Sequence, residues 1–175
     1  TFCLTLTLLG TFPFLAAGAQ TPPTSADPTP VTTITVNSTA DYSADGRSKT
    51  CLNATPCTLR RAINQAHSLG AAARPVLIRF DIPASEAAPG NYWKITLQGS
   101  SLDDLRELNG KTILDGSTQP RGRTTGPRIV INGAGSHNRG FTLRNGGNVV
   151  RGVAMQSFKT EHISVASNDN KVEDC

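Results

Sequence analysis

The sequence predicts an all-β solenoid, a fold in which successive turns of chain stack on one another. The first observation is an internal repeat: Asn148–Gly152 (NVVRG) returns as Asn170–Asp174 (NKVED), 22 residues later (170 − 148). The second is a series of short strand-like runs, bounded by Asn and Gly, from Pro75 onward. An ordinary β-sandwich is the competing fold, but it would favour hairpin turns between antiparallel strands over a recurring register.

The first 19 residues have the composition of a secretory signal. Residues 1–19 carry no charge, are mostly apolar and end in Ala17-Gly18-Ala19, a small-residue cleavage pattern. A transmembrane anchor is the alternative, but Gly10 and Pro13 interrupt the run, which is also short for a membrane span. The sequence therefore predicts a signal peptide whose basic n-region is missing, and a protein that is secreted or held at the cell surface.

Two segments are expected between the signal and the repeats. Residues 20–33 are rich in Pro, Thr and Ser, which is typical of a flexible linker. Residues 34–110 are expected to form an N-terminal cap, whose clearest element is an amphipathic helix at 58–69. Thr58 can cap the start of this helix and Gly70 can supply its left-handed end. Such a helix would cover the apolar end of the first turn of the solenoid.

Alternating or β-branched runs predict strands along the chain. These runs are Val31–Val36, Val76–Ile82, Tyr92–Leu97, Thr112–Gly116, Arg128–Gly133 and Gly140–Gly146. Gln119–Gly126 is expected to be a loop pushed out between strands. Both ends of the chain look cut, so we expect residues 111–175 to be the first coils of the solenoid, truncated at the C-terminus.

The repeat also predicts a register. Alignment of Ile113–Gly116 with the two copies of the repeat places Leu114, Val150 and Val172 in one inward column. The same alignment stacks the side chains of Asn148 and Asn170 at a turn, where Asn tolerates left-handed dihedrals.

Two segments carry a resemblance to a known family. Cys51–Ile63 (CLNATPCTLRRAI) resembles the Cys-Ser-Leu-Arg-Glu-Ala-Ile segment near the N-terminus of many secreted bacterial right-handed parallel β-helix proteins. Ile113–Pro120, followed by Gly126–Val130, is similar to the first coil of that family. The resemblance covers roughly residues 32–175 and implies a right-handed parallel β-helix with a capping helix. Arg61 departs from the family's Glu, and we expect it on the exposed side of the helix.

The cysteines predict a disulfide and no metal site. Cys51 and Cys57 close a short loop in a chain predicted to be exported, where a disulfide is the natural state of such a pair. Metal binding would need further ligands nearby, and none lies at useful spacing. Cys175 has no visible partner in the sequence.

The charge balance favours an anionic polymer over nucleic acid. The net charge is +4, with 17 basic and 13 acidic residues. Arg121 and Arg123 are the densest basic spot, which is typical of a solvated loop. No basic stripe with interleaved aromatic residues is present, so nucleic-acid binding is not expected. A mildly basic surface can favour anionic polysaccharide or another polymer of the cell envelope.

Three charged residues are the candidates for catalysis. The register places Asp115, Arg151 and Glu173 on one outward face of successive coils. They would act as an acid–base group on polysaccharide, or form a salt-bridged ladder between neighbouring coils. No cofactor is expected, except that a lyase could use Ca²⁺.

Other residues offer weaker signals. Tyr92 and Trp93 are the only adjacent large aromatic residues, and they would either stack on a sugar ring or pack in the core. A cluster of acidic residues resembles the solvated face of a turn or short helix: Asp103, Asp104 and Glu107. The histidines are isolated in sequence: His67, His137 and His162.

These features predict an exported cell-surface β-helix protein with a structural, adhesive or glycan-binding role. The expected partner is polysaccharide or a cell-envelope glycan; a membrane span after signal cleavage is not expected, and the protein is expected to be monomeric. The alternative is a polysaccharide lyase or glycoside hydrolase with its site on the β-helix face. Whether the protein is an enzyme stays open, with the balance against it.

Overall fold

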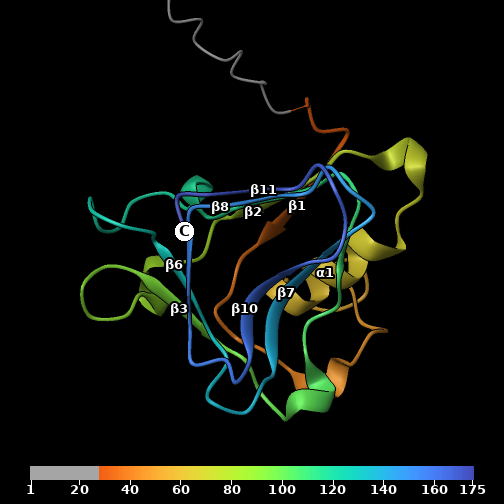
Figure 1. The fold of residues 1–175 in the computed structure, drawn as a ribbon. Coiled ribbons are helices and arrows are strands. Elements are labelled where there is room, and N and C mark those ends of the chain that lie inside the picture. Colours follow the sequence, from red (N-terminus) through yellow and green to blue (C-terminus); the bar gives the residue numbers. More distant parts are fainter. Residues whose placement is uncertain (1–27) are drawn as a thin grey trace, which may run out of the picture.

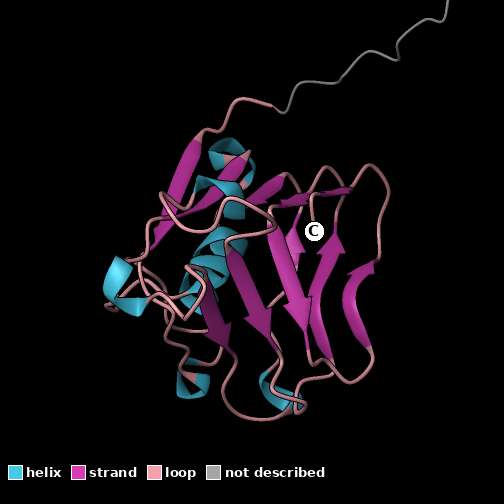
Figure 2. Ribbon diagram, turned by 90° about the vertical axis from the view of Figure 1, so that its left-hand side faces the viewer, coloured by secondary structure: helices cyan, strands magenta, loops and turns pink. Residues whose placement is uncertain are grey.

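The structure, a computed structural model, describes residues 28–175 apart from the side chain of Asp103. The predicted signal peptide at 1–19 and residues 20–27 of the predicted linker lie outside the described residues. The described part of the chain forms three parallel sheets of five, three and three strands, together with one α-helix (Figures 1 and 2). None of its helices is both long and apolar enough to span a bilayer.

Each sheet collects strands that are distant in sequence, and Figure 2 shows them side by side. The five-stranded sheet has the order β1 (Thr32–Val36), β2 (Val76–Phe80), β5 (Thr112–Asp115), β8 (Val149–Arg151) and β11 (Lys171–Glu173). The second sheet has the order β10 (Glu161–Val165), β7 (Arg139–Arg144) and β4 (Leu108–Asn109). The third has the order β3 (Trp93–Thr96), β6 (Ile129–Asn132) and β9 (Val153–Gln156).

The helices are α1 and five short 3₁₀ segments. α1 spans Leu59–Ser68, and the 3₁₀ segments are η1 (Ser43–Asp45), η2 (Ala71–Ala73), η3 (Ala84–Glu86), η4 (Ser101–Asp103) and η5 (Gly116–Thr118).

The prediction of an all-β, right-handed parallel β-helix solenoid is wrong. The structure is a mixed α/β arrangement of three short sheets with a buried helix. The repeat of 22 residues holds from Val149 to Lys171, which are paired in register. The preceding steps along the same sheet are longer, since Val76 pairs with Thr112 and Ile113 with Val149. Strands of the other sheets, 3₁₀ segments and loops take up the extra length of these two steps. The step from β1 to β2 is longer still, since Thr32 pairs with Val76, and it contains α1, so no uniform repeat governs the chain.

The individual strands were predicted more accurately than the fold. Each of the six runs expected as strands contains one, within a few residues of the expected bounds. The loop expected between strands also exists, because no regular element lies between η5 and β6. Three strands were not predicted from the sequence: β4, β9 and β10.

The predicted register of the last strands is confirmed. Leu114 pairs with Val150, and Val150 pairs with Val172. Leu114 and Val150 are fully buried, whereas Val172 lies on the edge strand β11 and is 43% exposed. The Asn stack exists too, since Asn148 donates its Nδ2–H to Oδ1 of Asn170 at 2.8 Å. These contacts tie the corner turns of neighbouring strands together.

Helix α1 is buried on nearly all sides. Its apolar face packs against β1, β2 and β4, and residues 59–66 are all buried. Thr58 caps the first turn as predicted, its Oγ1 accepting from the N–H of Arg61 at 3.4 Å. Gly70 does not supply a left-handed end, because its φ is −74°. Instead Arg74 donates to the carbonyls of Ala66 and Leu69, which satisfies acceptors that every helix C-terminus leaves open.

The polar face of α1 is covered by the loop that precedes it. Arg60 donates Nε–H and Nη2–H to the two carboxylate oxygens of Asp41, at 2.8 and 2.7 Å. Arg61 makes the same kind of pair with Asp45, at 2.6 and 3.1 Å. The expectation that Arg61 is exposed is therefore wrong, because the loop of residues 41–49 folds over it. The buried charge of Arg61 is neutralised by the carboxylate of Asp45.

The predicted disulfide between Cys51 and Cys57 is present. It closes residues 51–57, between the loop that carries Asp41 and Asp45 and the start of α1, and both cysteines pack against the hydrophobic core. The bond therefore restricts the short segment that leads into α1 in the unfolded chain as well as in the folded one.

Removing this disulfide is expected to destabilise the protein moderately. A loop closed over six residues of separation gives a chain-entropy contribution of about 2 kcal/mol. The variant Cys51→Ser/Cys57→Ser should lose about this much free energy of unfolding in urea titrations, as should the wild type in reductant. Cys175→Ser is the control, since Cys175 is a free and exposed thiol. An unchanged urea midpoint after complete reduction would show that the loop is held by its hydrogen bonds alone.

Candidate functional site

A loop pushed out from one corner of the structure forms one wall of a pocket. The chain leaves β5, makes the single turn η5 and enters the loop at Gln119. The Gln119 side chain is fully buried and forms two hydrogen bonds with the backbone of Ile82, accepting from its N–H at 2.9 Å and donating to its carbonyl at 3.0 Å. Further on, the N–H of Arg123 donates to the carbonyl of Asn91 at 2.7 Å. The loop is thus anchored at both places, which fixes its path across the corner.

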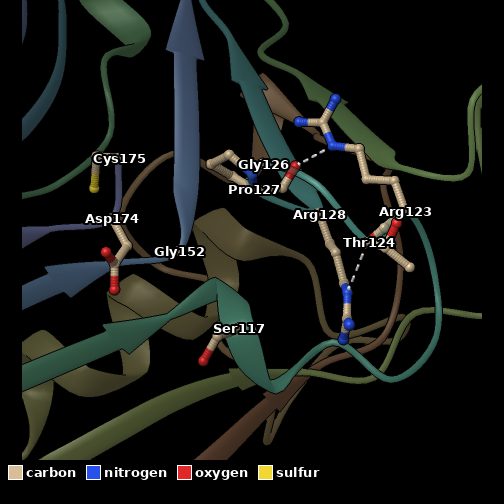
Figure 3. Close-up of a pocket in the computed structure, with 9 residues that line it drawn as sticks. All are labelled: Ser117, Arg123, Thr124, Gly126, Pro127, Arg128, Gly152, Asp174 and Cys175. Carbon is tan, nitrogen blue, oxygen red and sulfur yellow. Dashed lines mark hydrogen bonds between the residues drawn. The ribbon is translucent and has the colours of Figure 1, made fainter.

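The pocket beside this loop has a volume of about 480 Å³. One wall is the loop, and the other is formed by the ends of β8 and β11, where Figure 1 places the C-terminus. Figure 3 shows the lining residues: Ser117, Arg123, Thr124, Gly126, Pro127, Arg128, Gly152, Asp174 and Cys175. The lining offers hydroxyl, guanidinium and carboxylate groups, so it suits a polar ligand.

The two arginines of the loop have different surroundings. Arg123 donates its Nε–H to the carbonyl of Pro127 at 2.6 Å, and its guanidinium lies over the Tyr92 ring, 5.0 Å from the centroid. Arg128 donates its Nη1–H to the carbonyl of Gln119 at 2.8 Å and its Nε–H to that of Arg123 at 3.3 Å. The cation–π contact and the backbone hydrogen bonds orient both side chains before any ligand binds.

The three predicted catalytic candidates are brought together as one network. Arg151 donates Nε–H to Oδ2 of Asp115 at 2.8 Å, and its Nη1 lies 3.6 Å from the carboxylate of Glu173. Glu173 is also 2.9 Å from Nζ of Lys171. Asp115 is only 4% exposed, and its other oxygen accepts from the N–H and the hydroxyl of Ser117. Both oxygens of Asp115 are occupied, so this group is arranged as a ladder that fixes the corner, beside the pocket and not within it.

The two predicted aromatic candidates lie in different environments in the structure. Trp93 is 2% exposed and donates its Nε1–H to the carbonyl of Pro83 at 2.9 Å, so it is a core residue. Tyr92 is half-buried, and one face of its ring is covered by Arg123. Tyr92 therefore supports the loop through Arg123 and is not itself one of the residues that line the pocket.

The acidic cluster and the histidines form local pairs. Asp104 accepts from Nδ1 of the buried His137 at 3.0 Å, while Nε2 of His137 has no hydrogen-bond partner. Glu107 lies 3.9 Å from Nε of Arg144. The pKa of the Glu107 carboxyl is held below its ordinary value, first by a hydrogen bond from its own backbone N–H and also by the charges of Arg47, His67 and Arg144. Among the side chains that the structure describes, which do not include that of Asp103, no three Asp, Glu, His or Cys side chains converge as metal ligands.

The pocket was not predicted from the sequence. Arg121 and Arg123 were noticed only as a basic spot in a loop, and Arg128 and Asp174 were not singled out. The signal that could have found them is positional, because Gly116, Gly152 and Asp174 follow the aligned strand residues and therefore meet at one corner. A polar loop inserted at that same corner, between η5 and β6, is where a pocket would form.

Fold and pocket together define a mixed α/β protein with a polar binding pocket at a sheet corner. No model of a known protein family matches the chain, and neither curated proteins nor solved structures gave a match. Membership of the family that Cys51–Ile63 resembles therefore stays a prediction. The function has to be argued from the residues of the pocket.

Proposed function

We propose that this protein is exported and binds a glycan in the corner pocket. The observation that carries the proposal is the lining of that pocket, in which hydroxyls of Ser117 and Thr124 lie with the charged groups of Arg128 and Asp174. Sugars are recognised through dense hydrogen bonding to such groups, because each sugar hydroxyl both donates and accepts. A volume of about 480 Å³ leaves room for a short stretch of polysaccharide.

Two further observations support this proposal. The loop backbone is anchored on Gln119 and Arg123, so the pocket does not need to order itself upon binding. Two features agree with export to the cell surface or beyond, where glycans are present. Residues 1–19 are uncharged and mostly apolar, and Cys51 and Cys57 form a disulfide. A purely structural or adhesive role would require no pocket of this polarity.

The alternative function, a polysaccharide lyase or glycoside hydrolase, has less support. General acid–base catalysis needs a carboxylate or base that can reach the substrate. Asp115 is buried with both oxygens hydrogen-bonded, and Arg151 and Glu173 pair with each other and with their neighbours. Binding assays should still include product detection, with and without Ca²⁺, since turnover would favour the enzyme.

Filling the pocket is expected to weaken glycan binding. Thr124 lines the pocket and is exposed, so the variant Thr124→Trp should fold normally and reduce affinity for the bound polysaccharide by about tenfold or more. Thr125→Trp is a matched control, because Thr125 is the next residue, is also exposed and does not line the pocket. Affinity electrophoresis through gels with neutral or anionic polysaccharides would measure both variants. Equal retardation of the two would place the binding site elsewhere.

A further inference from the structure

We propose that the glycan bound in the pocket is a carboxylated sugar, with its carboxylate on Arg128 and its ring hydroxyls on Asp174. This inference rests on the proposed function and names the ligand class for the same site. The chemistry fits either a uronic acid within a polymer or a sialic acid at the end of a glycan. Both present a carboxylate on one side of a sugar ring and hydroxyls on another.

The loop backbone holds the Arg128 side chain in place. Its Nη1 and Nε donate to the carbonyls of Gln119 and Arg123, which fixes the plane of the guanidinium. Within the described part of the chain, no carboxylate lies in salt-bridge distance of Arg128. Its positive charge therefore remains available on the wall of the pocket. A planar, pre-oriented guanidinium binds a carboxylate more strongly than it binds a neutral hydroxyl.

Asp174 lies across the pocket from the loop. Figure 3 shows Asp174 and Cys175 on one side of the pocket, with Arg128 and Thr124 on the other. The carboxylate of Asp174 is exposed and, among the described residues, lies in no salt bridge. A carboxylate accepts hydrogen bonds from two neighbouring sugar hydroxyls and repels a second negative charge. The two walls thus favour different parts of the ligand, the carboxylate on Arg128 and the hydroxyls on Asp174.

The side chains that line the pocket carry more positive than negative charge. The side chains of Arg123 and Arg128 contribute two positive charges and that of Asp174 one negative charge, so the side chains of the lining favour an acidic ligand over a neutral one. The thiol of Cys175 adds no negative charge near neutral pH, because the partial burial of this side chain raises its pKa. A ligand without a negative group would leave the charge of Arg128 unmatched within the pocket.

The experiment compares ligands first, because this comparison needs no altered protein. Isothermal titration of the full chain would use trigalacturonic acid against its methyl ester, and sialyllactose against its methyl ester. The proposal expects at least one free acid to bind about tenfold tighter than its uncharged counterpart, the size of one charged hydrogen-bond pair. The pair that shows the preference identifies the source of the carboxylate.

Other outcomes separate this inference from the proposed function. Equal binding of acid and uncharged forms would overturn the carboxylated ligand and leave glycan binding intact. Binding of none of the four, together with equal behaviour of Thr124→Trp and Thr125→Trp on all polysaccharides, would overturn both.

Variants then test the roles of the two walls. Arg128→Gln should reduce the preference for the acid to about unity, and Arg128→Lys should keep part of it. Arg121→Gln is the control, because Arg121 is exposed in the same loop and does not line the pocket. Asp174→Asn should weaken the uncharged ligands at least as much as the acids, because it removes hydrogen bonds to both and a repulsion that only the acids feel. If Arg128→Gln keeps its thermal unfolding midpoint and still prefers the acid, the assignment to Arg128 is wrong.

Discussion

Replacing Asp41 with alanine is expected to lower the free energy of unfolding by about 3–5 kcal/mol, the cost of leaving a buried charge without its partner. The side chains of Arg60 and Asp41 are 3% and 1% exposed. Two N–H groups of Arg60 point at the carboxylate, which also accepts from the backbone N–H of Gln98 at 2.9 Å. Alanine would strand all three donors in a place that water reaches poorly.

Urea unfolding would measure this change, with the single, buried tryptophan as a fluorescent probe. Glu161→Ala is the matched control, since Glu161 also pairs with an arginine, but on the surface: the Arg139 and Glu161 side chains are 55% and 44% exposed. Its cost should stay below about 0.5 kcal/mol. The double variant Arg60→Met/Asp41→Leu should recover much of the loss, because it removes the stranded charge. Equal costs for the buried and the surface pair would contradict this account.

The sequence predicted local structure well because local structure follows local patterns. The apolar spacing of α1 and the β-branched runs of β2 and β6 depend only on neighbouring residues, and each element lies where it was expected. The burial of Arg61 could not be predicted in this way. It depends on Asp45, which lies 16 residues away and meets Arg61 only after the loop has folded over the helix.

The fold class was missed for a related reason. The repeat at Asn148 and Asn170 is real, and the two side chains are hydrogen-bonded. The 22-residue spacing holds only between the last two strands of the sheet, β8 and β11. The Asn148 side chain also accepts a hydrogen bond from the N–H of Thr112 at the preceding strand, and there the spacing is 36 residues. A periodicity inferred from one short step gave no information about the helix and loops that fill the longer ones.

The candidate site was also predicted only in part: the charged ladder was expected from the sequence, and the pocket was not. The alignment of Asp115, Arg151 and Glu173 followed from the strand register, and the structure shows that they form a ladder. The pocket combines residues 117, 123–128, 152 and 174–175, which no spacing rule connects. It depends on the path of one inserted loop, and that path is set by the tertiary contacts of Gln119.

Replacing Gly116 with alanine is expected to have the second large effect on stability and to remove ligand binding with it. A Cβ at this position would lie 2.2 Å from the carbonyl oxygen of Gly152 and 2.8 Å from Cγ1 of Val153. The nearest atom belongs to the backbone, so no side-chain rotation can relieve the clash, and β5 must move away from β8. We expect a loss of about 3 kcal/mol or more.

The corner that Gly116 occupies is also the floor of the pocket, since Ser117 and Gly152 both line it. Separation of the two strands should therefore weaken glycan binding under conditions in which the variant is still folded. Gly70→Ala is the control: its φ is −74° and a Cβ there would meet nothing within 4 Å, so alanine should be neutral or stabilise by up to about 1 kcal/mol. Thermal unfolding and titration with the same oligosaccharides measure the two effects separately. A Gly116→Ala protein with unchanged stability and affinity would show that the corner is looser than the contact between Gly116 and Gly152 requires, and the pocket would then have no rigid floor.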